Sequence, residues 1–416
     1  MNRKTKRMLK KDHRFLNEVM NIIHKYFPEL FDMFNDLTDL RHQSYIDYNM
    51  KTICVTRFIA LICGIKTMNA MTDTFNNDNV INNISNILNM NLSELPHYDT
   101  INDVFEKINE QEIRSKMFDN YRYNKKIQLI VDGTGLVTFN YKHCDHCLVD
   151  NHKDGTKTYK HYVLEAKMCF GDIVISLDSE FVENPDSSVI NIKKQDNEIK
   201  AFKRMAKRIK QNFPKLQFII VGDSLYAAEP LIKICLDNKW DYIFSIKSTR
   251  IKSAYEDFEG IISIDTGSKH KNYFLLENYH YQKVFFNIIR YYDELDKKKF
   301  TYITNIKIND NNIKDVIYLA RKRWKIENEG FNEQKNGTFN INHMCSYNYN
   351  AMKIHYFFIQ FAHTIRQLFD KGRPFVRELK IKIKEVSTTL VLELTSSTAD
   401  LNLNLGFQLR FAMLII

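Results

Sequence analysis

Two short apolar runs, each followed by an aspartate and small residues, constrain the fold of this chain most strongly. The first lies in "KIQLIVDGTGLVTFN", where Asp132 follows "QLIV", and the second in "QFIIVGDS", where Asp223 follows "FIIVG". Apolar runs of this length, bounded by glycine and serine, are typical of buried strands. Acids at the ends of strands in one sheet can converge on a common point. The pattern therefore predicts a sheet with two acids at one edge.

The sequence around these runs predicts the rest of the sheet. Two further strands are expected at "KHYVLEAKMCF" and "DIVISLDSEFV", joined by a tight hairpin at "CFGD". A basic helix is expected over "DNEIKAFKRMAKRIKQNF", another helix after Asp223, and a strand at "DYIFSIKS". The order β-β-β-α-β-α-β favours an α+β fold with a mixed sheet flanked by helices.

Changes in sequence texture along the chain predict five segments. Residues 1–120 are expected to be helical, with Asp99 or Thr100 capping a helix through "INDVFEKINEQEIRSKMF". Residues 121–247 are expected to form the first part of the core, which contains the sheet. A β-rich insertion is expected over 248–308, and the helical part of the core, with the third acid, over 309–372. The C-terminal segment 373–416 has no assigned role, and its "TTLVLELTSS" suits either strand or helix.

Charge and composition narrow the class of partner. The 416 residues carry 60 Lys and Arg against 50 Asp and Glu, a formal net charge of +10, which favours nucleic acid over membrane. No apolar run reaches the roughly 18 residues of a membrane span. Seven scattered cysteines do not suggest a disulfide framework, and a cytoplasmic location fits. Seven basic residues lie near the start of the chain: Arg3, Lys4, Lys6, Arg7, Lys10, Lys11 and Arg14. They suit either an arm that contacts the DNA backbone or a solvated terminus.

A third acid, Glu327, lies in "RKRWKIENEGFNEQKNG". On an ideal α-helix Arg323 shares its face, Glu329 points away, and Gln334 falls in line with Glu327, whereas Lys335 is displaced by roughly 80°. An i,i+4 salt bridge of about 0.3–0.5 kcal/mol would explain Arg323 beside Glu327. It would not explain the two aspartates that follow strands.

The three acids predict a metal site. Hard divalent cations take oxygen ligands, and Mg²⁺ takes one or two carboxylates plus substrate phosphate. Asp132, Asp223 and Glu327 are therefore the expected catalytic residues and ligands of Mg²⁺, with Mn²⁺ as a substitute. Each aspartate also suits a turn, and Asp223 could cap the helix expected at "SLYAAEPLI".

With these flanks, the chain resembles a DDE transposase of bacterial insertion sequences, in the cut-and-paste branch with a β-strand insertion before the catalytic Glu. The resemblance runs from "LPHYDTINDVFEKI" through "VDGTG", "SEFVEN", "GDSLYAAEPLI" and "RWKIENEGFN" to "KIHYFFIQFAH". It implies an RNase H-like core, with residues 1–120 binding the DNA ends. It also implies Mg²⁺-dependent nicking at those ends by water, and attack on target DNA by the freed 3′-hydroxyl. Because two ends must be brought together, a homodimer is expected.

The helix around Glu327 matches the Tyr-Arg-Glu-Lys signature of that family only in part. Arg323 matches its Arg. The Tyr position is Ala320, with Tyr318 nearby, and the Lys position is Gln334, with Lys335 one residue later. Arg323 and Lys335 are the expected DNA contacts. Trp324 is expected to pack in the core.

Two other functions remain open from the sequence. Glu165 and Lys167 in "LEAK", with Asp132 or Asp154 upstream, suit a restriction-type nuclease, although alternation along a strand would place both on a solvated face. Alternatively, the protein is a DNA-binding repressor, or an inactive transposase that binds ends without cutting them.

A cysteine and histidine cluster occupies "YKHCDHCLVDNHK", which contains His143, Cys144, His146, Cys147 and His152. Cys144-x-x-Cys147 has the spacing of a zinc site. A closed tetrahedral site needs two more ligands, for which His152, His161 or Cys169 could serve. Because no second Cys-x-x-Cys pair is present, the sequence favours a metal-free loop over structural Zn²⁺.

Overall fold

The computed structural model describes residues 14–396 except for 43, 45, 111, 114–125, 171–172, 186–194, 265–272, 294–296, 310, 374–375 and 377–380. The chain forms two compact units, each described below by itself. The helical unit takes residues 1–120, 171–176 and 329–413, and the sheet unit takes residues 121–170, 177–328 and 414–416. The basic residues from Arg3 to Lys11, and the hairpin residues Gly171 and Asp172, lie outside the described residues.

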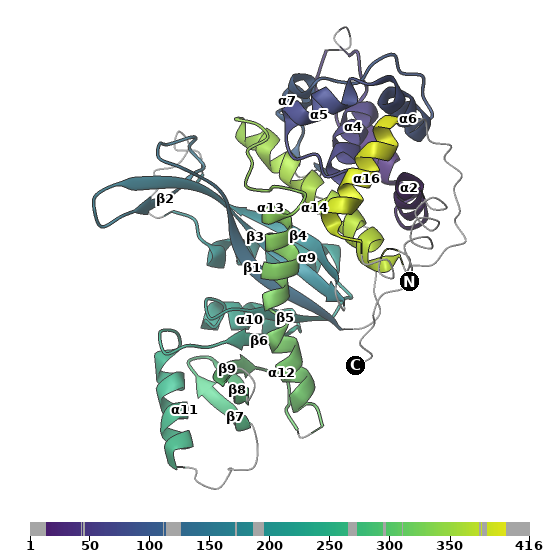
Figure 1. Ribbon diagram of the computed structural model, residues 1–416. Helices are drawn as coiled ribbons and strands as arrows, with labels where there is room; N and C mark the ends of the chain where they lie inside the picture. Colours follow the sequence, from purple (N-terminus) through teal and green to yellow (C-terminus); the bar gives the residue numbers. More distant parts are fainter. Residues whose placement is uncertain are drawn as a thin grey trace. The chain divides into compact units, whose positions relative to one another are not determined.

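The sheet unit contains nine described strands and four described helices (Figure 1). In chain order they are β1 (Ile127–Phe139), β2 (Leu148–Asn151), β3 (Lys157–Phe170), β4 (Ile173–Val182), α9 (Glu198–Asn212), β5 (Phe218–Gly222), α10 (Glu229–Asp237), β6 (Asp241–Ser245), α11 (Lys252–Ile264), β7 (Tyr273–Tyr281), β8 (Val284–Asp293), β9 (Lys298–Thr304) and α12 (Ile313–Arg321). The first residues of β4, up to Ser176, belong to the helical unit.

The described strands form one nine-stranded sheet in the order β2-β3-β1-β5-β6-β9-β8-β7, with β4 paired to β3. β1 runs antiparallel to β3 and parallel to β5. β5 runs parallel to β6, and β6 antiparallel to β9. Parallel and antiparallel pairs thus meet in one sheet, which confirms the predicted mixed sheet flanked by helices.

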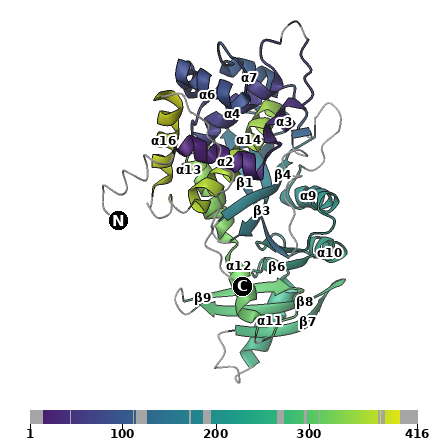
Figure 2. The same ribbon diagram turned by 90° about the vertical axis from the view of Figure 1, so that its right-hand side faces the viewer.

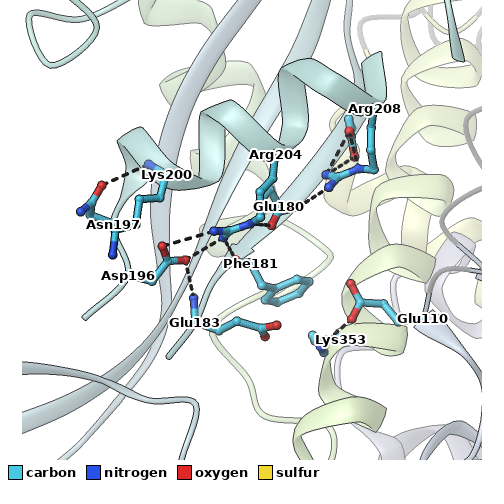
Figure 3. Close-up of polar contacts among 11 residues, drawn as sticks. Glu110, Glu180, Phe181, Glu183, Asp196, Asn197, Lys200, Arg204, Arg208 and Lys353 are labelled. Carbon is cyan, nitrogen blue, oxygen red and sulfur yellow. Dashed lines mark hydrogen bonds and ion pairs between the residues drawn. The ribbon is translucent and has the colours of Figure 1, made fainter. Parts of the chain in front are cut away.

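Helix α9 is held to strand β4 by ion pairs. Its apolar face buries Phe202, Met205 and Ile209 at helical spacing. On its other side, Arg204 pairs with Glu180 of β4 and lies 2.7 Å from Asp196, while Arg208 lies 2.6 Å from Glu180 (Figure 3). The basic helix predicted here therefore uses both arginines within the fold.

The strands predicted after residue 270 are confirmed, but they join the same sheet through the β6–β9 pair. The sequence did not predict β2, or α11 within the segment expected to be β-rich. Ala254 and Phe258 of α11 are buried four residues apart, a helical spacing that the surrounding aromatic residues obscured. Figure 2 shows α11 against β7 and β8, where Arg290 of β8 lies 5.3 Å from the ring of Phe258 and 2.7 Å from Glu259.

The helical unit is built around one long buried helix. Its described helices are α2 (Phe15–Tyr26), α3 (Leu30–Asn35), α4 (Met50–Ile62), α5 (Met68–Phe75), α6 (Asp78–Leu88), α7 (Tyr98–Phe105), α13 (Glu333–Asn336), α14 (Tyr349–Gly372) and α16 (Ile383–Ser396). α14 is buried along most of its length, and its Phe358 stacks on Phe34 at 5.2 Å between ring centroids. Its Arg366 donates to the carbonyl oxygen of Ile62 and to Ser387 Oγ, which ties α14 to α4 and α16 inside this unit.

Two details of the helical unit differ from or complete the prediction. α7 begins at Tyr98 after a capping His97, whose Nδ1 accepts from the Asp99 amide, so the expected caps at Asp99 and Thr100 were wrong. The "TTLVLELTSS" stretch is helical and buries Leu390 and Leu394 four residues apart. Within the described residues, no helix is both long enough and apolar enough to cross a membrane.

Candidate active site

Asp132 lies within strand β1 at the point where the strand loses one neighbour. β1 pairs with β5 only over Ile127 to Ile130, opposite Phe218 to Val221, whereas its pairing with β3 continues to Phe139. The prediction that the strand ends at Asp132 was therefore wrong. Because β5 stops there, the β5 side of Asp132 is open to the residues that follow β5.

Asp223 directly follows β5, as predicted. Since Ile130 pairs with Val221 in a parallel register, Asp132 and Asp223 come level with each other two residues further on. Asp223 Oδ1 accepts from the Leu225 amide at 2.8 Å, which turns the chain sharply. Helix α10 begins only at Glu229, after Ala228, so Asp223 does not cap it.

Arg323 joins the first and third acids. Its Nη1 lies 2.9 Å from Asp132 Oδ2 and 2.9 Å from Glu327 Oε1. Burial acts to lower the pKa of Arg323, but the carboxylates of Asp132 and Glu327 raise it overall. The i,i+4 pair expected from the sequence is therefore present, with Asp132 as an additional partner.

The surroundings of Asp132 strongly perturb its carboxyl. Burial raises its pKa to about 7, against the opposing effects of Arg323 and of the Gly133 amide, and the charges of Asp223 and Glu327 raise it further. Burial and the two neighbouring acids make the Asp132 carboxyl hard to ionise. A cation bound beside it would favour the charged carboxylate. Carboxylate oxygens are also the ligand type that Mg²⁺ prefers.

The comparison with known families decides the assignment. Residues 30–390 match the family model described as Transposase DDE domain group 1. The chain belongs to this family of DDE transposases. No curated protein matches it. DDE transposase domains generally use divalent metal ions, and the mixed sheet flanked by helices is consistent with their RNase H-like fold.

In the transposase, Glu327 lies on a π-helix, η2 (Ile326–Asn332), and not on an α-helix. The ideal α-helical register that related Gln334 and Lys335 to Glu327 therefore does not hold. Gln334 is buried in the helical unit, where its Nε2 lies 2.7 Å from Gln360 Oε1. Lys335 lies on α13 in the helical unit, and burial lowers its pKa.

Trp324 is 47% exposed, so the prediction that it packs in the core was wrong. Ile326, two residues later, takes the fully buried position instead. Lys325 Nζ lies 6.0 Å from the centroid of the Trp324 ring, and Lys322 Nζ lies 4.4 Å from that of Tyr318. Aromatic and cationic groups thus lie together just before η2, although both lysines are buried.

A fourth carboxylate, Glu198, was not predicted from the sequence. It is the first residue of α9 and accepts from the hydroxyls of Tyr162 at 2.7 Å and Tyr226 at 3.2 Å. Burial raises the pKa of Glu198, and the charge of Asp223 raises it further. Tyr226 lies three residues after Asp223, and Tyr162 packs over Gly133, so this cluster supports both aspartate segments from one side. The glutamate carried no local sequence signal, since it begins a basic helix.

The residues of the alternative nuclease site are not solvated. Glu165 and Lys167 are fully buried and form an ion pair at 3.2 Å, so the prediction of a solvated face was wrong. Val163, Leu164 and Ala166 are buried beside them, because both faces of β3 are covered here. Glu165 is the register partner of Asp132. Asp154 is exposed in the turn after β2, where its Oδ1 accepts from Thr156.

The structure also gathers part of the cysteine and histidine cluster. Of the candidate ligands, His143, Cys144, Cys147 and His161 come together, with their ligand atoms all within 4.8 Å of one another. His152 instead lies 2.9 Å from Thr158 Oγ1 through its Nε2, and Cys169 is not among the grouped residues.

Proposed function

We propose that this transposase binds the ends of a bacterial insertion sequence, nicks the DNA there by metal-assisted hydrolysis, and joins the freed 3′-hydroxyl to target DNA. The cut-and-paste branch with a β-strand insertion before the catalytic Glu is part of the proposal. The contact of Arg323 with both Asp132 and Glu327 carries it, because it draws acids from distant parts of the chain to one point.

Asp132, Asp223 and Glu327 are the proposed catalytic residues and the proposed ligands of Mg²⁺, for which Mn²⁺ can substitute. The raised pKa of Asp132 supports this role, since a cation favours the charged carboxylate. Bound Mg²⁺ would lower the pKa of the attacking water and stabilise the leaving oxygen. Asp132 and Asp223 lie where the pairing of β1 with β5 ends, and Arg323 links Asp132 to Glu327.

The proposed reaction has two displacements at phosphorus. In the first, the oxygen of water bonds to phosphorus, the bond to the 3′-oxygen breaks, and that oxygen takes up a proton. In the second, the 3′-hydroxyl loses its proton as its oxygen bonds to a target phosphorus, the bond from that phosphorus to the target 3′-oxygen breaks, and that oxygen takes up a proton. Arg323 and Lys335 are the proposed phosphate contacts, because guanidinium and ammonium groups bind phosphate well.

DNA is the partner that the family implies, and the net charge of +10 supports it. The segment 1–120 is proposed to bind the element ends. A homodimer is proposed because two ends must be held together for the reaction. The cytoplasm, where bacterial DNA lies, is the proposed location.

Incubating the full chain with the DNA that flanks its own gene tests the proposal. We expect Mg²⁺-dependent nicks at the element ends with the native protein and none with Asp132→Asn. Salt-dependent DNA binding without cleavage by the native protein would instead identify a repressor or an inactive transposase. The restriction-type alternative would cleave with Glu327→Gln and fail with Glu165→Gln.

A further inference from the structure

Four potential metal ligands outside the catalytic acids lie around one point at the base of a β-hairpin. Cys144 Sγ and Cys147 Sγ are 3.8 Å apart, and they lie 3.7 and 3.6 Å from His161 Nε2. His161 Nε2 is 3.4 Å from His143 Nδ1. Three of these residues come from the connection between β1 and β2, and the fourth comes from β3.

These separations match the edges of a tetrahedron around zinc. An ion about 2.3 Å from sulfur and about 2.0–2.1 Å from nitrogen sets two sulfurs about 3.8 Å apart, sulfur and nitrogen about 3.6 Å, and two nitrogens about 3.3 Å. The four separations given above each lie within about 0.2 Å of their counterparts. The two remaining edges, from His143 Nδ1 to the two sulfurs, are no longer than 4.8 Å.

The ligand types select the metal. Two thiolates and two imidazoles in a tetrahedron are typical of zinc, whereas Mg²⁺ prefers oxygen ligands. Four protein ligands close the coordination shell, which is the mark of a structural and not a catalytic zinc site. His161 and Cys147 are 1% and 2% exposed, so half of the site is shielded from solvent.

The surroundings hold the ligands in place. The ring of His143 stacks on Phe139 at the end of β1, with centroids 4.5 Å apart and an interplanar angle of 7°. Asn184 Nδ2 donates to the Cys147 carbonyl oxygen at 2.8 Å, and the Asn184 amide donates to that of His146. Such contacts orient ligands before a metal binds.

We propose that His143, Cys144, Cys147 and His161 bind one structural Zn²⁺ ion in this protein. The ion ties the β1–β2 connection to β3 and thereby fixes β2, a four-residue strand that pairs with β3 at the far end of the β1–β3 ribbon (Figure 1). A short strand after an eight-residue connection gains little stability from pairing alone, so a metal crosslink explains how it is held.

Metal analysis of the full chain, purified under reducing conditions without chelator, tests the proposal. We expect one zinc per chain, and tetrahedral thiolate absorption bands after replacement by Co²⁺. Chains without bound metal that also fail to take up added Zn²⁺ or Co²⁺ would overturn the proposal, as would stoichiometric iron in place of zinc.

Variants then locate the ion. Cys144→Ser and Cys147→Ser should lose the zinc and the Co²⁺ bands, whereas Cys169→Ser, which removes a buried thiol from the same strand as His161, should keep both. Asp132→Asn should also keep the zinc, which separates this site from the catalytic acids. Retention of one zinc by the folded Cys144→Ser/Cys147→Ser protein would overturn the assignment. The zinc content is measured without DNA, so it stands apart from the proposed cleavage activity.

Discussion

Arg323 Nη1 lies 2.9 Å from Asp132 Oδ2, although 191 positions separate the two residues. The same nitrogen lies 2.9 Å from Glu327 Oε1. Arg323 thus supplies positive charge between two acids that are proposed to hold a cation. Guanidinium and cation compete for the same oxygens, so binding of Mg²⁺ should release Arg323 toward the phosphates of DNA.

Replacing Arg323 should make the protein depend more on its cation. Arg323→Gln removes the guanidinium that offsets the repulsion among the three carboxylates, so the melting temperature without divalent cation should fall and Mg²⁺ should restore more of it than in the native protein. Cleavage should drop by roughly 10- to 100-fold, as for other residues that orient metal ligands. Arg321→Gln, which removes a cation of α12 that pairs with Asp293 of β8, serves as the control. Equal Mg²⁺ responses in the two variants would argue against this role of Arg323.

Stability without metal should depend on pH through Asp132. Its pKa in the folded protein is raised to about 7, so the protonated form stabilises the fold, and this contribution is lost as the pH rises from about 4 through about 7. At about 1.4 kcal/mol per pKa unit, the loss amounts to a few kcal/mol. Chemical denaturation between pH 4 and 8 with a chelator measures it. Asp132→Asn should lack this component and be the more stable protein at pH 8; an identical pH profile in both would refute the assignment.

Glu165 should matter for folding and not for chemistry. Its carboxylate pairs with buried Lys167, and removing one partner of a buried pair costs about 3–5 kcal/mol. Glu165→Gln should therefore melt at a lower temperature yet cleave when assayed below that temperature, whereas Glu327→Gln should fold normally and not cleave. The reverse pattern in a cleavage assay would favour the restriction-type nuclease.

Two glycines of β1 should respond differently to alanine. A Cβ at Gly133 would come within 2.5 Å of the Tyr162 ring, whereas one at Gly135 would be 4.0 Å from it. Gly133→Ala should cost about 1–3 kcal/mol through overpacking and displace the neighbouring Asp132. Gly135→Ala should be tolerated. Denaturation and cleavage assays of the pair check this, and equal stability of the two variants would contradict the packing described for Tyr162.

The sequence predicted most strands and the order of the acids because these depend on local patterns. Apolar runs identify β5 and β6, and the aspartate after β5 lies where the pattern indicates. The position of Asp132 inside a long strand was not predictable, since it depends on β3 extending further than β5 along β1. How far a strand extends past its neighbour in the sheet depends on tertiary contacts and not on the local sequence.

The remaining errors also concern tertiary contacts. The π-helix at Glu327 shifts every later side chain relative to an α-helical prediction, and no residue type signals it. Glu198 is linked to the site by hydrogen bonds from the hydroxyls of Tyr162 on β3 and Tyr226 after β5. These contacts depend on the fold, so no local sequence motif identifies Glu198. Of the proposed zinc ligands, Cys144, Cys147 and His161 were candidates from the sequence, but His143 was not offered as a ligand. His161 lies 14 residues beyond Cys147, and only the fold brings the two together. The placement of Lys335 as a DNA contact stays a prediction.

The central claim is that Asp132, Asp223 and Glu327 act as one catalytic set. The most direct test measures Mg²⁺-dependent nicking of element-end DNA by Asp132→Asn, Asp223→Asn, Glu327→Gln and the double variant Asp132→Asn/Glu327→Gln, with DNA binding recorded in parallel. We predict that each single variant binds the ends but nicks them at least about 10³-fold more slowly than the native protein. The double variant should nick no more slowly than the single variants, because the effects of residues that act as a unit are not additive. Nicking at the native rate by any one of the single variants would contradict the claim.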